Sequence, residues 1–291
     1  MTTVLKSCFW PHALSHAHSH RYLITYTLKR RAAATFSTNA DPNIIPPWMR
    51  PLRDIDETLL EPVALKKGAA RWGFALFRCN YDDKYTSNWK RMVGLLDETV
   101  RRSLELEEPD RLDLLPTHQL SIIEDPVRLD GASSHVVRDA FTQWTEKELA
   151  RILEHPMPTK RTDGMQDIMG PRFNFCIFVD DICLESLDET PGRPVVKMLI
   201  RDWEKPADPM DVLGPYKDPI YRLCDDHGYE DGVSDDPGED VGWMYIQVCN
   251  YVEYFNRFVL TPNWDVWYRR PPGLENWGSR VMLPGGWRKK A

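Results

Sequence analysis

Apolar residues recur along the first half of the chain in two spacings, which predict alternating strands and helices. Residues 72–79 (WGFALFRC) are apolar on both faces, which is typical of a central strand. A helix follows, with Ser87 as its expected N-cap. Its apolar residues share one face: Trp89, Met92, Val93, Leu96 and Val100. Leu120, Ile122 and Ile123 then predict a short strand.

The second half continues this alternation. A helix is expected to begin at Ser133 or Ser134 and to end at His155-Pro156. Residues 173–180 predict a strand whose two faces are both largely apolar. Residues 195–203 alternate, with Val196, Met198 and Ile200 facing inward and Lys197 on a solvated face. One wet face is typical of antiparallel pairing.

Residues 243–248 predict the last strand, and a helix carrying Val252, Phe255 and Val259 follows it. The order of elements indicates the α+β class. We expect a single, mostly antiparallel sheet with helices packed on one face.

Charge divides the chain into two parts. Residues 1–40 hold no Asp or Glu and five Lys or Arg, whereas residues 41–291 hold 32 of the 37 basic residues and all 44 acidic ones. This second part has a formal charge of −12. A basic, acid-free segment ending in AAATFSTNA is typical of a mitochondrial presequence, which predicts the matrix as destination. A disordered terminus or a start-codon artefact explains the same segment, and the protein would then be cytoplasmic.

Composition suggests four regions. Residues 1–40 form the leader, and the proline-rich residues 41–70 form a linker. Residues 71–272 form the α+β domain, which contains an acidic loop at 204–240. Residues 273–291 form a Trp/Arg-rich tail. We expect this tail to be a strap on the domain first, an interface second and a nucleic-acid contact third.

Several classes of function are disfavoured. The acidic body argues against nucleic-acid binding. No window approaches the roughly 18 apolar residues of a membrane span. The six cysteines lack zinc-like spacing, and Cys79, Cys176 and Cys249 lie in apolar runs, so buried free thiols are expected. We therefore expect no metal and no cofactor.

Three residues are candidates for chemistry. His135 and Asp139 stand four apart on one helix and so share a face, as an acid–base pair would. Asp180 ends a strand beside Asp181, where two carboxylates could bind a divalent cation or split their pKa values. The structural alternatives are a helix-start histidine near a surface acid, and a solvated strand end.

Five segments occur in an order that resembles a known group of proteins. They are WGFALFRCNY, RLDGASSHVVRDAFTQW, FNFCIFVDDICLESL, GWMYIQV and WDVWYRRPPG. Over residues 71–272 the chain is similar to a large family of uncharacterised proteins of filamentous fungi. The resemblance implies a soluble protein with many paralogues, some near secondary-metabolite genes. It implies no activity and no catalytic residue.

These observations favour a non-catalytic binding or accessory protein of fungal metabolism, with a protein or a small apolar metabolite as its partner. The alternative is a small-metabolite enzyme that uses a His/Asp acid–base pair without a known signature.

Overall fold

The structure is a computed structural model of the 291-residue chain. It describes residues 52, 55, 69–153, 170–203, 240–259, 263–274 and 283–290. Contacts divide the chain into two units, Met1–Arg50 and Pro51–Ala291, and all the described residues belong to the second. The predicted leader (1–40) lies outside the described residues. So do most of the predicted linker (41–70) and the acidic loop except Asp240.

Five strands form one mixed sheet in the order β2-β1-β3-β4-β5. β1 is parallel to both β2 and β3, whereas β3–β4 and β4–β5 are antiparallel. The strands are β1 Ala75–Arg78, β2 Ser121–Ile123, β3 Phe175–Val179, β4 Val195–Ile200 and β5 Trp243–Gln247. The predicted α+β class is confirmed.

Helices connect and cover these strands. The α-helices are α3 Thr86–Arg102, α4 Pro126–Leu129, α5 Ser134–Ile152, α7 Pro171–Asn174, α8 Asp181–Glu189, α9 Tyr251–Arg257 and α10 Asn263–Trp267. The 3-10 helices are η2 Asp83–Tyr85, η4 Pro109–Thr117, η8 Val248–Asn250 and η9 Gly286–Lys290, and η3 Ser103–Glu107 is a π-helix that extends α3.

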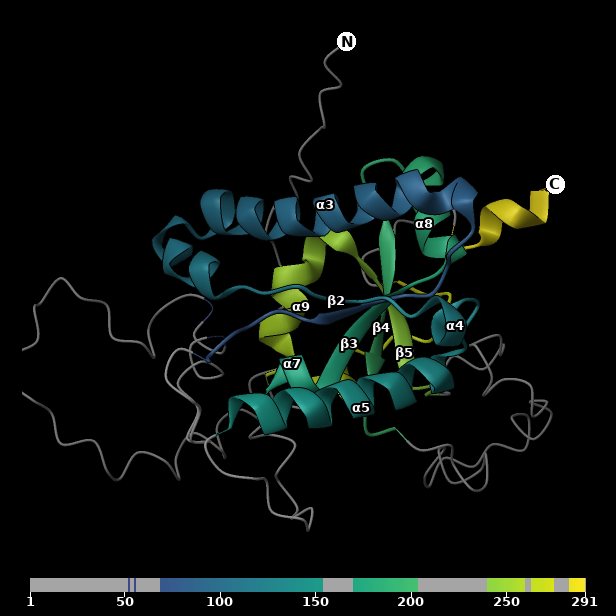
Figure 1. Cartoon of the computed structure of the whole chain (residues 1–291). Helices are drawn as coiled ribbons and strands as arrows, with labels where there is room; N and C mark the ends of the chain where they lie inside the picture. The colour runs from purple at the N-terminus through teal and green to yellow at the C-terminus, as the bar shows by residue number, and fades with distance from the viewer. Residues whose placement is uncertain are drawn as a thin grey trace, which may run out of the picture. The chain divides into compact units, whose positions relative to one another are not determined.

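The connections around β1 leave the sheet on opposite sides. The chain passes from β1 through α3 to β2, and then through α5 to β3 on the other side of β1. Because crossovers between parallel strands are right-handed, these two reversed steps place α3 and α5 on opposite faces, as Figure 1 shows. The carboxyl ends of β1 and β3 therefore form a topological switch point, where ligands of open α/β sheets bind.

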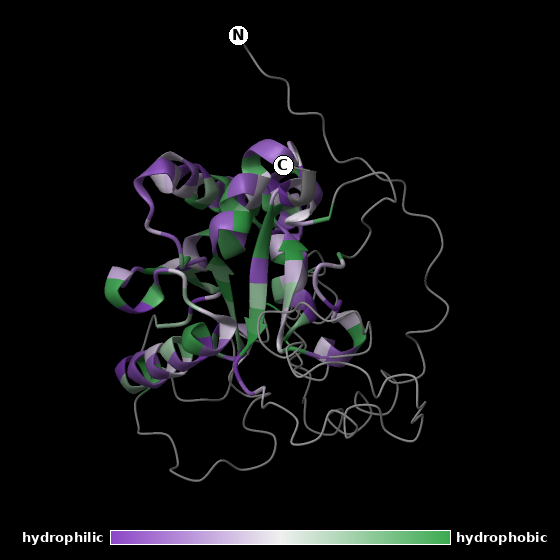
Figure 2. Ribbon diagram, turned by 90° about the vertical axis from the view of Figure 1, so that its right-hand side faces the viewer, coloured by the Kyte–Doolittle hydropathy of each residue, from purple (hydrophilic) through white to green (hydrophobic). Residues whose placement is uncertain are grey.

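Both faces of the sheet are covered, whereas the sequence analysis expected helices on one face only. Phe77 contacts Phe141 of α5 on one face, and Phe175 contacts Phe258, the C-cap of α9, on the other. Apolar residues accordingly gather on the strands and on the helix sides turned toward them (Figure 2). The physical reason is that β3 and β4 have buried residues at every position.

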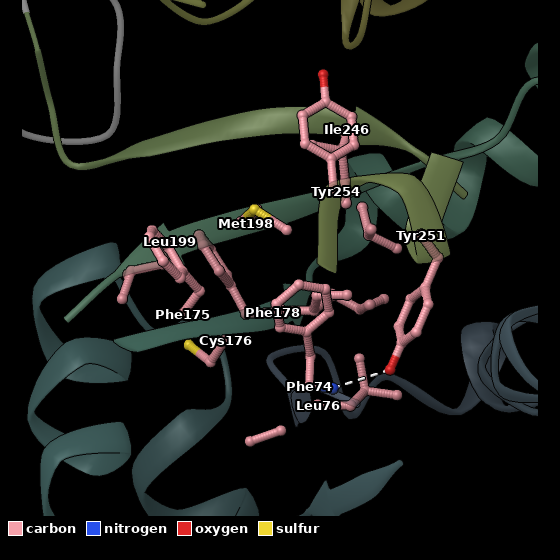
Figure 3. Packing of buried hydrophobic residues seen from close by; sticks show 14 of the residues in the cluster. Phe74, Leu76, Phe175, Cys176, Phe178, Met198, Leu199, Ile246, Tyr251 and Tyr254 are labelled. Atoms are coloured by element: carbon pink, nitrogen blue, oxygen red, sulfur yellow. Dashed lines mark hydrogen bonds between the residues drawn. The ribbon is translucent and has the colours of Figure 1, made fainter. Parts of the chain in front are cut away.

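Aromatic side chains connect α9 to the residue that precedes β1. Tyr251 packs edge-on against Phe74, and its hydroxyl accepts a hydrogen bond of 2.9 Å from the Phe74 N–H (Figure 3). The same hydroxyl lies 3.2 Å from Nε2 of His118. A tyrosine hydroxyl has both a proton and lone pairs, so it can accept from Phe74 and bond to His118 at the same time.

Four details of the predicted elements need correction. The N-cap of α3 is Tyr85 rather than Ser87. The third strand starts at Phe175, because Phe173 and Asn174 belong to the one-turn helix α7. Lys197 is 8% exposed and not on a wet face. Cys249 is exposed, whereas Cys79 and Cys176 are buried as predicted.

Candidate functional site

The polar side chains at the switch point come from the ends of two strands and the start of α8. Asp180 follows β3 directly and is the N-cap of α8, where its Oδ1 accepts from the Cys183 N–H at 3.0 Å. Its Oδ2 lies 2.6 Å from Nζ of Lys197, which β4 supplies. Side-chain exposure is 18% for the aspartate and 10% for the lysine. The two residues therefore form a largely desolvated ion pair.

Asp180 and Lys197 each stabilise the charged form of the other. Burial disfavours both ions, but the Lys197 ammonium and the α8 amide hold the pKa of Asp180 below its usual range. Burial likewise acts to lower the pKa of Lys197, and the Asp180 carboxylate outweighs it, so that this pKa is raised. Asp180 is thus ionised and Lys197 protonated across the physiological range.

Three aromatic rings enclose the ammonium of Lys197. Its Nζ lies 4.4 Å from the ring centroid of Trp243, 5.5 Å from that of Tyr245 and 5.4 Å from that of Phe178. The register explains this, because Lys197 pairs with Phe178 on β3 and with Tyr245 on β5, which places all of them on one face. We call Lys197, Asp180, Phe178, Trp243 and Tyr245 the lysine box.

The lysine box contains a buried hydrogen-bond donor that lacks an acceptor among the described residues. Nε1 of Trp243 is buried without a hydrogen-bond partner. Tyr245 is 4% exposed, and its hydroxyl is not among the buried polar atoms that lack a partner. Burial raises the pKa of Tyr245, so this hydroxyl keeps its proton. Buried polar groups of this kind are normally satisfied by protein, water or ligand.

Two thiols beside the lysine box are inert. Burial, followed by the charge of Asp180, raises the pKa of Cys79 to about 12 and that of Cys183 well above its ordinary value. Both thiols are therefore protonated at neutral pH, whereas a nucleophilic cysteine acts as its thiolate.

Backbone and side-chain hydrogen bonds fix the loops next to Cys79. The Gly131 N–H donates to the Cys79 carbonyl at 3.0 Å, and the Tyr81 N–H donates to Asp130 Oδ1 at 3.1 Å. The Tyr81 hydroxyl accepts from the Asp125 N–H at 2.7 Å. Asp130, which precedes the helix of His135, is therefore engaged in holding the loop after β1.

The structure does not bring the three predicted candidates together. His135 Nδ1 lies 3.3 Å from Nη1 of Arg138, and its ring lies against Trp203. Asp139 is exposed, and within the described part of the chain no hydrogen bond joins it to His135. Arg138 donates to the carbonyls of Ile200 and Gly242, at the far end of β4 from Lys197. Asp180 is thus remote from the other two.

The C-terminal segment binds next to the start of α8. Oε2 of Glu185 accepts from Trp287 Nε1 at 2.7 Å and from Arg288 Nε at 2.8 Å, while Oε1 accepts from Arg288 and from the Tyr85 hydroxyl. Arg288 also pairs with Asp181 at 2.9 Å. These bonds lower the pKa of Glu185 to about 2, with Arg288 as the main cause. Part of the predicted tail is therefore a strap on α8.

Neither a metal site nor a membrane span is found within the described ranges. No group of three His, Cys, Asp or Glu residues there is placed to hold an ion. Asp181 turns to Arg288 and to its own helix start rather than to Asp180. No described helix is both long and apolar enough to cross a bilayer.

No protein-family model, curated protein or solved structure matches this chain significantly. The interpretation of the site therefore depends on its geometry.

Sequence reasoning found Asp180 but not its partners. Lys197 was placed on a wet face because a lysine in an alternating strand is usually solvated. A signal was present, since Trp243 and Tyr245 recur two apart on a neighbouring strand, as the wall of an aromatic box would.

Proposed function

We propose that this chain is a non-catalytic binding protein, an accessory to fungal metabolism, that holds a small and largely apolar metabolite at the carboxyl ends of β1 and β3. The observation that carries the proposal is the lysine box. It combines a desolvated Lys197–Asp180 pair, three aromatic rings and one unpartnered donor, Nε1 of Trp243, next to a topological switch point. Ligand sites are typically apolar with a few convergent polar groups.

The protonation states of the lysine box favour recognition over catalysis. A general acid or base works best when its pKa is near the operating pH. The pKa of Asp180 is lowered and that of Lys197 is raised, so both are displaced away from neutrality. A charge pair held in this way can orient a ligand but exchanges protons poorly.

Saturable binding without turnover tests the proposal. The full chain is titrated with 2-acetonaphthone, a small aromatic ketone, and binding is followed by quenching of tryptophan fluorescence and by calorimetry. We expect stoichiometric binding that is lost in the double variant Asp180→Asn/Lys197→Met, which removes both charges at similar volume. The ketone should be recovered unchanged after prolonged incubation. Binding that the double variant retains, or conversion of the ketone, contradicts the proposal.

A mitochondrial destination is part of this proposal. It is supported by the absence of acidic residues in the first forty positions, beside five basic ones. A C-terminal fluorescent fusion, imaged with and without residues 1–40, tests it together with sequencing of the mature N-terminus. Mitochondrial signal that disappears on truncation is expected. A diffuse signal from both forms would assign the protein to the cytoplasm.

A further inference from the structure

We infer that the ligand of the lysine box presents a neutral oxygen acceptor, of the ketone, lactone or quinone type, to Trp243, Tyr245 and Lys197. This inference rests on the proposed binding function and specifies the chemical class of the ligand.

The polar groups that await a partner in the box are donors. Nε1–H of Trp243 can only donate, and it has no acceptor among the described residues. The Tyr245 hydroxyl is protonated, and its pKa is raised by burial. Lys197 has three ammonium protons, and Asp180 is the one oxygen that accepts from it within the described chain. An oxygen acceptor on the ligand would complete these bonds.

The rings that carry two of these donors are adjacent to each other. The Trp243 and Tyr245 rings meet edge to face with their centroids 5.2 Å apart, and both face the same ammonium. Trp243, Tyr245 and Lys197 are 2%, 4% and 8% exposed as whole residues, so a hydrogen bond formed there is little weakened by water.

Charge favours a neutral acceptor over a carboxylate. The Lys197 charge is already balanced by Asp180 at 2.6 Å. A second acid, Asp181, is near enough to raise the pKa of Tyr245 together with Asp180. Asp181 is itself paired with Arg288, so an anion entering the box would meet two carboxylates whose cations are both already compensated. A carbonyl oxygen accepts the same hydrogen bonds without that repulsion.

The aromatic side chains of the lysine box suit a ligand with an aromatic ring. Phe178 and Trp243 pack edge to face, and the pair provides apolar surface around the donors. Asp180 keeps 18% of its side chain exposed, so this end of the box meets solvent. The geometry points to a flat, apolar molecule whose carbonyl enters first.

Three naphthalenes that differ only in their head group test the inference. The full chain is titrated calorimetrically with 2-acetonaphthone, 2-naphthoate and 2-ethylnaphthalene. We expect the ketone to bind most tightly, the hydrocarbon about tenfold more weakly, and the carboxylate more weakly than the ketone. The infrared carbonyl band of the bound ketone should shift to lower wavenumber, as accepted hydrogen bonds require.

Conservative variants identify the donors. Tyr245→Phe removes one hydroxyl and should weaken ketone binding about fivefold, move the carbonyl band back and leave hydrocarbon binding unchanged. The matched control is Tyr254→Phe, which removes a buried hydroxyl on α9, the helix that covers the opposite face. It should leave all three affinities unchanged.

Each contrary result has a distinct meaning. Equal affinity for the three probes overturns the acceptor requirement and leaves the binding function standing. Tighter binding of naphthoate overturns the neutral class. Ketone binding that Tyr245→Phe does not weaken overturns the assigned donor. If none of the probes binds, the inference fails together with the proposed function.

Discussion

Asp180 and Lys197 meet at 2.6 Å on a face of the sheet where the two residues paired with Lys197, Phe178 and Tyr245, are aromatic. Removing one partner of such a pair leaves an uncompensated buried charge. Asp180→Asn should therefore lower the free energy of unfolding by about 3 kcal/mol in urea titrations. Asparagine still caps α8, so the loss reports the charge and not the cap.

Two further variants complete this test. Asp188→Asn, on the same helix, removes the charge of an exposed carboxylate that pairs with Arg91 and accepts from Asn88 Nδ2, and it should cost less than about 1 kcal/mol. Adding Lys197→Met to Asp180→Asn should recover most of the lost stability, because no lone ammonium remains. Equal stability for Asp180→Asn and the wild type would show that water reaches the pair freely.

His118 should make stability fall in mild acid. Burial, and secondarily Arg172, lowers its pKa to about 4, whereas the unfolded chain has the ordinary value near 6.5. The unfolded state therefore binds the proton first. Stability is complete above about pH 6.5 and decreases as the pH falls toward 4, by about 3 kcal/mol in total.

Urea unfolding at pH 7.5 and pH 4.5 measures this effect. His118→Asn should reduce the difference in stability between the two pH values. His135→Asn replaces a half-buried histidine in the first turn of α5 and should preserve that difference. If the His118→Asn variant loses as much stability between pH 7.5 and pH 4.5 as the wild type, groups other than His118 cause the acid sensitivity.

Alanine substitutions at two glycines with similar backbone angles distinguish the cost of backbone strain from the cost of a steric clash. Gly242 (φ +71°) and Gly131 (φ +63°) both adopt left-handed geometry. A methyl group on Gly131 meets no atom within 4 Å, whereas one on Gly242 would lie 2.5 Å from Arg138 and from Trp203. Gly131→Ala should cost about 1 kcal/mol. Gly242→Ala should lower the stability clearly more in thermal unfolding. If the two variants lose similar stability, the Arg138 and Trp203 side chains move aside easily.

Among the described residues, a hydrogen bond joins the two ends of the acidic loop. Nε1 of Trp203 donates to the Asp240 carbonyl at 3.1 Å, and Asp240 caps the turn into β5 through the Gly242 N–H. Replacing residues 205–238 by a short Gly/Ser linker should therefore keep the fold, with a melting temperature within a few degrees of the wild type. Loss of cooperative unfolding would instead mean that this segment contributes to the core.

Local patterns predicted most of the elements. Strands β1, β4 and β5 and helices α3 and α5 lie where hydrophobic spacing placed them, because each buries a periodic set of side chains. Helix α8 was missed. It is nine residues long, and the aspartate that caps it was interpreted as a strand-end carboxylate. Capping and ligand binding use the same oxygen atoms, so the residue type alone does not separate them.

Long-range relationships were beyond local patterns. The parallel pairing of β1 with both β2 and β3 depends on crossovers, and these also bring helices to both faces. The burial of Lys197 depends on Asp180 at the end of one neighbouring strand and on Tyr245 in the other. The sequence of one strand does not specify which strands will pair with it, so the lysine box is apparent only in the assembled sheet.

The strap on α8 also has a consequence for biosynthesis. Trp287 and Arg288 lie 102 and 103 residues beyond Glu185, their common acceptor. On the ribosome, α8 emerges and can dock on α3 well before its partners are translated. Until then Glu185 and Asp181 lack Arg288. The nascent chain therefore passes through a stage in which the acidic side of α8 lacks the strap, which can bind only after Trp287 and Arg288 are translated.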